Sequence, residues 1–267
     1  MRVIVTRPAR EALRWAADLS AGGLEALAIP LITIGPVDNP SELLRVGRQV
    51  GIYAGVMFVS ANAADYFFAS SALLAPLFAS DGAITTRAWA TGPGTGRALA
   101  RAGVAPERID LPAADSAQFD SEALWQMVRS QLQPGDRVLI VRGADDADGA
   151  DSRSGSGRDW FAGQVAAAGA QVEFVAAYRR RAPEFDPAER ELARQAAHDG
   201  SVWLFSSAQA LRNLMLSLPG QSWSQARALA THPRIADAAR SAGFAVVRQA
   251  RPALPDLLAA LKSYDVP

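Results

Sequence analysis

The sequence of 267 residues contains no cysteine and only two histidines, His198 and His232. Without cysteine, the chain has no disulfides, thiol nucleophiles or thiolate metal sites, and two histidines supply too few ligands for a typical zinc site. We therefore expect no metal site, and any chemistry must come from other side chains. Lysine is nearly absent as well, because Lys262 is the only one among 27 basic residues. This bias is either compositional drift or a use of the planar guanidinium to pair with carboxylates.

The sequence also lacks a charge excess and a long hydrophobic run. Its 27 basic and 27 acidic residues give a net charge of zero, so no broad basic field can hold nucleic acid or an anionic membrane. No apolar run approaches the roughly 18 residues that would cross a bilayer, and Met1–Val3 enters a predicted strand without a signal-peptide pattern. We therefore expect a soluble, cytoplasmic protein with no nucleic-acid and no membrane partner.

Three segments of the first half recur in the same order in the second half. The matching pairs are Val3–Arg7 with Val138–Arg142, Val56–Ser60 with Val202–Ser206, and Arg87–Pro93 with Arg227–Pro233. A repeat of this length indicates duplicated domains and not a solenoid of short units. Since 49% of the residues are apolar, the chain can bury two ordinary cores. We expect matching residues of the two copies to face one another across one site.

Each repeated segment is typical of a short buried strand followed by a helix. Continuous apolar runs predict strands at 3–5, 56–59, 88–90, 138–141 and 202–205. Amphipathic stretches predict helices at 9–19, 61–68, 96–102, 158–168 and 235–242, with further helices at 121–131 and 256–262. Apolar strands that alternate with amphipathic helices predict an α/β fold with doubly wound parallel sheets.

Two proline-marked stretches, Ile34–Pro40 and Arg181–Pro187, follow equivalent copies of the first repeat. If the chain passes between domains at both points, one domain is inserted into the other, and the two halves are not simply side by side. The predicted outer domain then comprises residues 1–35 and 182–267, and the inserted domain residues 38–176. Linkers near 33–38 and 175–183 would form a hinge that permits domain motion.

Polar residues follow the predicted strands, where ligands bind in parallel α/β sheets because helix amino termini present free amides to anions. The candidate substrate-binding residues are Thr6, Arg7, Ser60, Asn62, Thr91, Gly92, Arg142, Ser206, Ser207, His232 and Arg234. Each hydroxyl could instead cap a helix, which contributes about 1 kcal/mol. Each arginine could instead form a surface ion pair worth about 0 to 1 kcal/mol. Together these turns would make a cradle for a polyanion.

Two glycine-containing segments have other interpretations. Gly92–Gly96 lacks the Gly-Lys-Ser/Thr ending of a P-loop and the glycine spacing of a dinucleotide site, so a nucleotide is not favoured. The segment Ala144–Gly157, rich in aspartate, glycine and serine, predicts a mobile surface loop. It has no glutamate at the position that closes a calcium-binding loop.

Several motifs resemble those of the uroporphyrinogen-III synthase family. They are Val5–Pro8, Pro30–Ile32, Phe58–Ala63, Ala177–Arg180 and Phe205–Ser207, and the resemblance runs in order from Arg2 to about Leu261. It implies two flavodoxin-like α/β domains, one inserted in the other and joined by a two-stranded linker. It also implies a cofactor-independent hydro-lyase of haem biosynthesis. Such an enzyme converts hydroxymethylbilane, a linear tetrapyrrole polycarboxylate, into uroporphyrinogen III by loss of water, ring closure and inversion of the fourth pyrrole.

The resemblance also implies roles for single residues. The family's Val-Tyr-Arg pattern reads Ala177, Tyr178 and Arg179 here, which makes Tyr178 the candidate catalytic hydrogen-bond donor. A phenol with a reference pKa near 10 is a weak acid, so positioning and partial proton donation are its expected role. Alternatively, Tyr178 packs the linker. The turn His232–Arg234 departs from the family's glycine-rich turn, and Arg234 either contacts propionates or pairs with a neighbouring carboxylate.

The family favours a monomer, in transient contact with the enzyme of the preceding step. A different class of protein is also compatible with the residues: a non-catalytic, two-lobed intracellular binding protein for a small anionic ligand. A nucleotide-dependent enzyme is a third alternative, in which nucleotide would raise the melting temperature.

Overall fold

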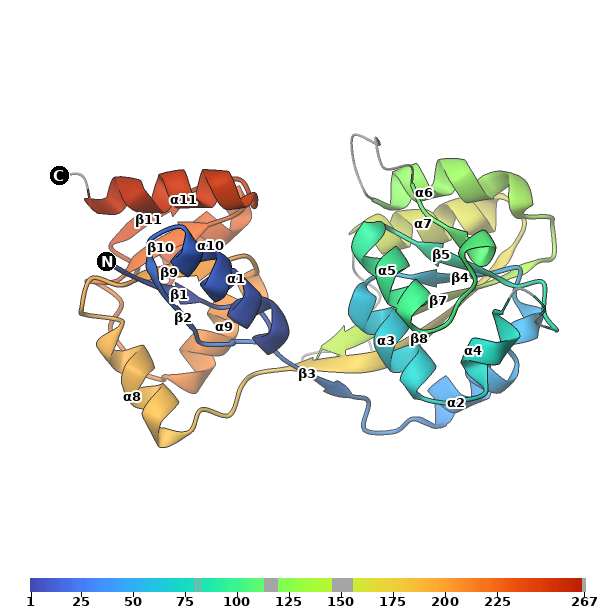
Figure 1. The fold of residues 1–267 in the computed structure, drawn as a ribbon, viewed down its shortest axis with the longest axis horizontal. Helices are drawn as coiled ribbons and strands as arrows, with labels where there is room; N and C mark the ends of the chain where they lie inside the picture. Colours follow the sequence, from blue (N-terminus) through green and yellow to red (C-terminus); the bar gives the residue numbers. More distant parts are fainter. Residues whose placement is uncertain (80, 82, 113–119, 146–155, 266–267) are drawn as a thin grey trace. The chain divides into compact units, whose positions relative to one another are not determined.

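The computed structural model describes residues 1–79, 81, 83–112, 120–145 and 156–265. The chain divides into two compact units, each built around its own sheet (Figure 1). Unit 1 comprises Met1–Ile34 and Arg181–Pro267, whereas unit 2 is the continuous stretch Gly35–Arg180.

Unit 1 contains a five-stranded sheet in the order β11-β10-β9-β1-β2, with every neighbouring pair parallel. The strands are β1 (Arg2–Val5), β2 (Glu25–Ala28), β9 (Val202–Phe205), β10 (Arg227–Ala230) and β11 (Val246–Gln249). The helices are α1 (Ala9–Ala21), α8 (Pro187–Gln195), α9 (Ala208–Ser217), α10 (Pro233–Ser241) and α11 (Leu254–Lys262), which a 3-10 turn at Ser263–Asp265 follows.

Alternating strand residues fill two cores in unit 1. Ile4 belongs to the core that α9 and α10 cover, whereas Val3 and Val5 belong to the core that α1 and α11 cover. The side chains of a strand point alternately to the two faces of its sheet, so a strand that is buried on both faces must be apolar throughout. This requirement explains the continuous apolar runs.

Unit 2 contains a six-stranded sheet in the order β3-β8-β7-β4-β5-β6. The strands are β3 (Thr33–Pro36), β4 (Gly55–Phe58), β5 (Arg87–Ala90), β6 (Ile109–Asp110), β7 (Arg137–Asp145) and β8 (Gln171–Arg181). The helices are α2 (Ser41–Arg48), α3 (Ala61–Ala69), α4 (Leu74–Leu77), α5 (Pro93–Arg101), α6 (Ser121–Val128) and α7 (Ser156–Ala167), with 3-10 turns at Val50–Ile52, Pro106–Arg108 and Arg129–Gln131. Met57 packs with α6 and α7, and Phe58 packs against Phe67 of α3, so helices cover both faces here as well.

The repeated segments occupy equivalent positions in the two sheets. The order β11-β10-β9-β1-β2 of unit 1 corresponds to β6-β5-β4-β7-β8 of unit 2. In unit 1 the chain forms the strand β1 first, whereas in unit 2 it forms the equivalent strand, β7, only after β4, β5 and β6. In unit 1 the strands follow the flavodoxin-like order 2-1-3-4-5 when they are numbered along the chain. The predicted α/β fold with doubly wound parallel sheets is confirmed.

Two strands carry the chain between the units. β3 begins in unit 1 and ends in unit 2, and β8 ends at Arg181, the first residue of the second segment of unit 1. The two strands are neighbours in the six-stranded sheet. β8 is a full sheet strand, because it pairs with β7 from Gln171 onwards.

The loop was predicted at 144–157, but both ends of this range belong to regular elements. Ala144 and Asp145 pair with Arg179 and Arg180 as the last residues of β7, and Ser156 begins α7. Residues 146–155 lie outside the described part of the chain. Among the described helices, none is both long and apolar enough to span a membrane.

Candidate functional site

In unit 2, candidate residues lie at the carboxyl ends of adjacent parallel strands. Ser60 follows β4 and caps α3, with its Oγ accepting a hydrogen bond from the Ala63 amide at 3.1 Å. Asn62 lies in the first turn of α3, and Thr91 and Gly92 connect β5 to α5. All four residues are half-buried, so solvent can reach them. Such strand ends are the ligand-binding edge of a doubly wound sheet.

Tyr178 lies on β8 with its phenol beside this edge. Its side chain is nearly buried, at 4% exposure, and its hydroxyl lies 3.3 Å from Oγ of Ser60. The ring stacks on Tyr66 of α3, with centroids 5.9 Å apart. Ser60 Oγ accepts from a backbone amide and still has one proton to donate. If Ser60 donates to the phenol oxygen, the phenol proton can be offered to a ligand.

An irregularity in strand pairing sets the position of Tyr178. Arg142 of β7 pairs with Ala176 of β8, but the next residue, Gly143, pairs with Tyr178, so Ala177 is an extra residue in β8. A β-bulge of this kind re-aims the side chains that follow it and is frequent beside active sites. The guanidinium of Arg142 lies over the ring of Phe174, 5.3 Å from its centroid.

In unit 1, the candidates that follow β1 make internal contacts. Thr6 is fully buried, and its hydroxyl donates to the carbonyl of Leu204 at 2.7 Å. Arg7 forms an ion pair with Glu11 at 2.8 Å, and its guanidinium lies 4.2 Å from the centroid of the Trp15 ring. The contact of Arg7 matches the ion pair that was its alternative, whereas Thr6 does not cap α1, whose N-cap residue is Pro8, and bonds to the neighbouring strand instead.

The turns after β9 and β10 combine helix capping with accessible donors. Ser207 caps α9 by accepting from the Gln209 amide at 3.1 Å, and Ser206 beside it is half-buried. His232 caps α10, since its Nδ1 accepts from the Arg234 amide at 3.2 Å. That acceptor role leaves the ring proton on Nε2 of the exposed imidazole. Arg234 is exposed and pairs with no carboxylate among the residues described.

Tyr66 and Gly143 also lie beside Tyr178, and neither is among the residues predicted from the sequence. Tyr66 follows Asn62 by four residues on α3, and residues at this spacing lie on the same helix face. The helix periodicity could therefore have placed Tyr66 beside the strand ends. Gly143 could not be found in this way, because its pairing with Tyr178 depends on the bulge.

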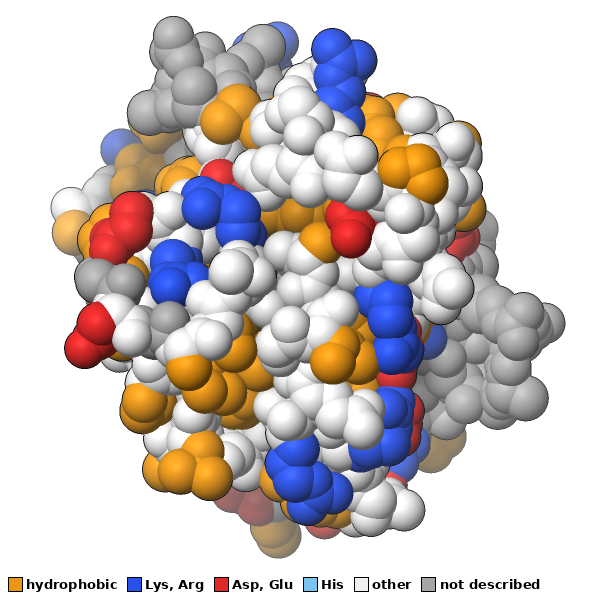
Figure 2. Space-filling model, turned by 90° about the vertical axis from the view of Figure 1, so that its right-hand side faces the viewer, with side chains coloured by type: hydrophobic (Ala, Val, Ile, Leu, Met, Phe, Trp, Pro, Cys, Tyr) orange, Lys and Arg blue, Asp and Glu red, His pale blue; other side chains and the backbone are white. Residues whose placement is uncertain are grey.

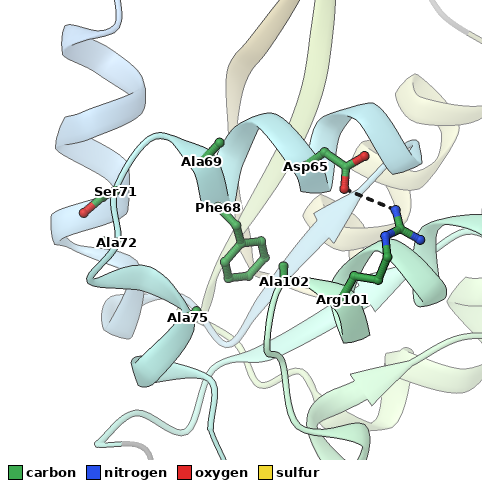
Figure 3. Close-up of a pocket in the computed structure, with 8 residues that line it drawn as sticks. All are labelled: Asp65, Phe68, Ala69, Ser71, Ala72, Ala75, Arg101 and Ala102. Carbon is green, nitrogen blue, oxygen red and sulfur yellow. Dashed lines mark hydrogen bonds and ion pairs between the residues drawn. The ribbon is translucent and has the colours of Figure 1, made fainter. Parts of the chain in front are cut away.

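A cavity of about 280 Å³ lies elsewhere in unit 2, near the last turns of α3 and α5 (Figure 3). Asp65 and Arg101 form an ion pair of 3.4 Å at one side, and Phe68 contributes an apolar wall. Its lining includes none of the candidate residues. In a doubly wound unit the helices run back along the sheet, so their last turns lie toward the amino ends of the strands. The cavity is therefore separate from the strand-end site.

On the face seen in Figure 2, basic side chains lie among acidic, polar and apolar ones. No cluster of three or more histidine, aspartate or glutamate side chains suited to a metal occurs in the described ranges. The arrangement at the strand ends therefore offers hydrogen-bond donors from hydroxyls, amides and a few arginines.

Comparison with known proteins gives a consistent family. The family model described as "Uroporphyrinogen-III synthase HemD" matches residues 14–259. The uroporphyrinogen-III synthase of Escherichia coli (strain K12) is 28% identical over 267 residues, which covers 97% of this chain and 98% of that protein. The uroporphyrinogen-III synthase of Chlorobaculum parvum (strain DSM 263 / NCIMB 8327) is 33% identical over 144 residues, 53% of each chain.

A solved structure agrees in fold. The crystal structure of a mutant uroporphyrinogen III synthase from the extremely thermophilic bacterium Thermus thermophilus superimposes with a TM-score of 0.53 at 17% identity. The alignment covers 99% of this chain and 98% of that one. The family match spans nearly the whole sequence, and this chain therefore belongs to the uroporphyrinogen-III synthase family.

Proposed function

We propose that this protein converts hydroxymethylbilane into uroporphyrinogen III as a cofactor-independent carbon–oxygen lyase of the cytoplasm. The family match over residues 14–259 is the observation that carries the proposal. The alternative of a non-catalytic binding protein has no comparable support. A monomer in transient contact with the enzyme that supplies its substrate suits this reaction.

The site chemistry that we propose begins with loss of the hydroxymethyl oxygen of the substrate. The lone pair of the adjacent pyrrole nitrogen expels this oxygen as the carbon–oxygen bond breaks, and the Tyr178 phenol, hydrogen-bonded to the oxygen, supplies the proton with which it leaves as water. Ser60, 3.3 Å from the phenol oxygen, can stabilise negative charge there by donating a hydrogen bond. The proton that the closing ring later loses restores the phenol.

Carboxylate recognition rests mainly on neutral donors. Helix amino termini attract anions, and the first turns of α3, α5, α9 and α10 follow the strand ends. The proposed substrate contacts are Ser60, Asn62, Thr91, Gly92 and Arg142 in unit 2, and Ser206, Ser207, His232 and Arg234 in unit 1. Since no described carboxylate pairs with Arg234, its guanidinium is available to a propionate.

Control of ring inversion is the demanding part of the reaction. Uncontrolled cyclisation yields the uninverted type I isomer, so the protein must hold the substrate ends in the geometry that lets the substituted carbon of the last ring attack. Positioning groups, and not strong acids, are therefore what this site has to supply.

The test is an isomer-resolved assay. Hydroxymethylbilane is generated enzymatically in the presence of the purified protein, and the porphyrins are separated after oxidation. We expect type III uroporphyrin to predominate and its amount to rise with protein concentration. Type I as the sole product would contradict the enzymatic function and favour the binding protein.

A further inference from the structure

We propose that Gly143 is a positioning residue for the reaction, because only a residue without a side chain lets the Tyr178 ring lie across β7 with its hydroxyl beside Ser60. The inference rests on the role proposed for Tyr178. It adds that the reaction needs a glycine at position 143 of the neighbouring strand β7.

The first observation is the closeness of the two residues. A Cβ atom at Gly143 would lie 2.5 Å from Cζ of Tyr178, 2.6 Å from Cε2 and 2.9 Å from the hydroxyl oxygen. All three distances are below 3.0 Å, which real Cβ contacts essentially never show. Gly143 is not among the residues with positive φ, so its backbone alone would admit any side chain. Space for the tyrosine ring is therefore the reason for glycine here.

The second observation is that the Tyr178 ring has little room to retreat. It is 4% exposed, stacks on Tyr66, and bonds to Ser60 through its hydroxyl. A methyl group at position 143 would push against the hydroxyl end of the ring. The phenol would then have to leave Ser60, while the rest of the sheet could stay in place.

The third observation is the bulge that brings the two residues together. Ala177 is the extra residue of β8, and as a result Tyr178 pairs with Gly143. In a regular ladder Ala177 would take that place, and Tyr178 would pair with Ala144. A shift by one residue moves a side chain to the other face of a sheet. The bulge and the glycine thus act as one device: the first turns the phenol toward Ser60, and the second makes room for it.

The kinetic test compares Gly143→Ala with wild type in the isomer-resolved assay. We expect kcat to fall by about tenfold and KM to change by less than about twofold, because the phenol loses its place while carboxylate binding persists. In the Tyr178→Phe background, the same glycine substitution should lower kcat little further. The matched control is Gly163→Ala, a position in α7 with no atom within 4 Å of the added Cβ, where kcat should not change. Wild-type kcat in Gly143→Ala would overturn the proposal.

A stability measurement tests the space requirement without any substrate. Gly143→Ala should lower the melting temperature of the wild-type protein by several degrees, since overpacking a buried contact is destabilising. In the Tyr178→Ala background, which removes the ring, it should lower the melting temperature far less. Equal losses in both backgrounds would overturn the proposal, even if Gly143→Ala proved too unstable for kinetics. Failure of the proposed function would show differently, as type I product from the wild-type protein.

Discussion

The hydroxyl of Thr6 lies at a strand end but forms a buried hydrogen bond inside unit 1. It is fully buried and donates to the Leu204 carbonyl on the neighbouring strand β9. Ser206, at the end of β9 itself, is half-buried. Burial thus separates two hydroxyls that are alike in the sequence, each of which ends a repeated apolar run.

We expect Thr6→Val to lower the free energy of unfolding by about 1 to 3 kcal/mol, because the buried Leu204 carbonyl loses its side-chain donor while the side-chain volume hardly changes. Urea denaturation followed by circular dichroism measures this. Ser206→Ala serves as the control and should change stability by less than about 0.5 kcal/mol. An unchanged unfolding midpoint for Thr6→Val would show that the bond contributes nothing.

Residues next to strand ends could be predicted, whereas their mutual contacts could not. Ser60 was recognisable because it follows an apolar run and precedes an amphipathic stretch. Its contact with Tyr178 depends on strand order, which places β7 between β4 and β8, and on the extra residue Ala177. Neither leaves a periodic signal in the sequence.

At the scale of elements, a polar cluster around Glu173 connects β8 to β7, to α2 and to Tyr53. The Tyr53 hydroxyl donates to Glu173 at 2.6 Å, Arg137 of β7 donates at 2.7 Å, and Arg45 of α2 also forms an ion pair with it. Burial alone would raise the pKa of Glu173. The hydrogen bonds from Tyr53 and Arg45 and the charges of Arg45 and Arg137 outweigh burial, so the pKa is lowered. Burial, and then the same carboxylate, raise the pKa of Tyr53.

This cluster predicts a pH-dependent contribution to stability. A carboxylate with a lowered pKa in the folded state stabilises the fold above its unfolded pKa, and the effect is lost as the pH falls through the folded value. We expect Glu173→Gln to lower the free energy of unfolding by about 1.5 kcal/mol at pH 7, and by progressively less below about pH 4. Urea denaturation at several pH values measures the difference, with Glu191→Gln on the exposed side of α8 as control. A difference that is constant with pH would contradict the assignment.

Apolar runs predicted five strands of the sheet interiors, but not the interior strands β8 and β10 or the edge strands. Continuous apolar runs identified β1, β4, β5, β7 and β9, because helices bury both of their faces. The edge strands β2, β6 and β11 went unrecognised. Their residues are mostly half-buried or exposed.

At the scale of the whole molecule, the chain contains one sheet arrangement twice, entered at different strands. Unit 2 is a continuous stretch with its own core, whereas unit 1 is assembled from two segments. Domains with a core of their own can in principle fold alone. The two strands that cross the boundary, β3 and β8, both belong to the sheet of unit 2.

We therefore expect a fragment of residues 33–181, which contains both crossing strands, to fold independently. Its thermal unfolding should be a single cooperative transition, with a near-ultraviolet circular dichroism signal from its buried aromatic side chains. The intact chain, scanned under the same conditions, is the reference. A fragment without a cooperative transition would show that unit 2 needs unit 1 to fold.

The central claim is that the Tyr178 phenol takes part in turnover of hydroxymethylbilane, and isomer-resolved kinetics of Tyr178→Phe test it most directly. The substitution removes one oxygen and keeps the ring that stacks on Tyr66, so substrate binding should persist. We expect kcat for type III formation to fall by at least about tenfold, with KM changed by less than about twofold. Wild-type kcat in Tyr178→Phe would remove Tyr178 from the mechanism and contradict the account.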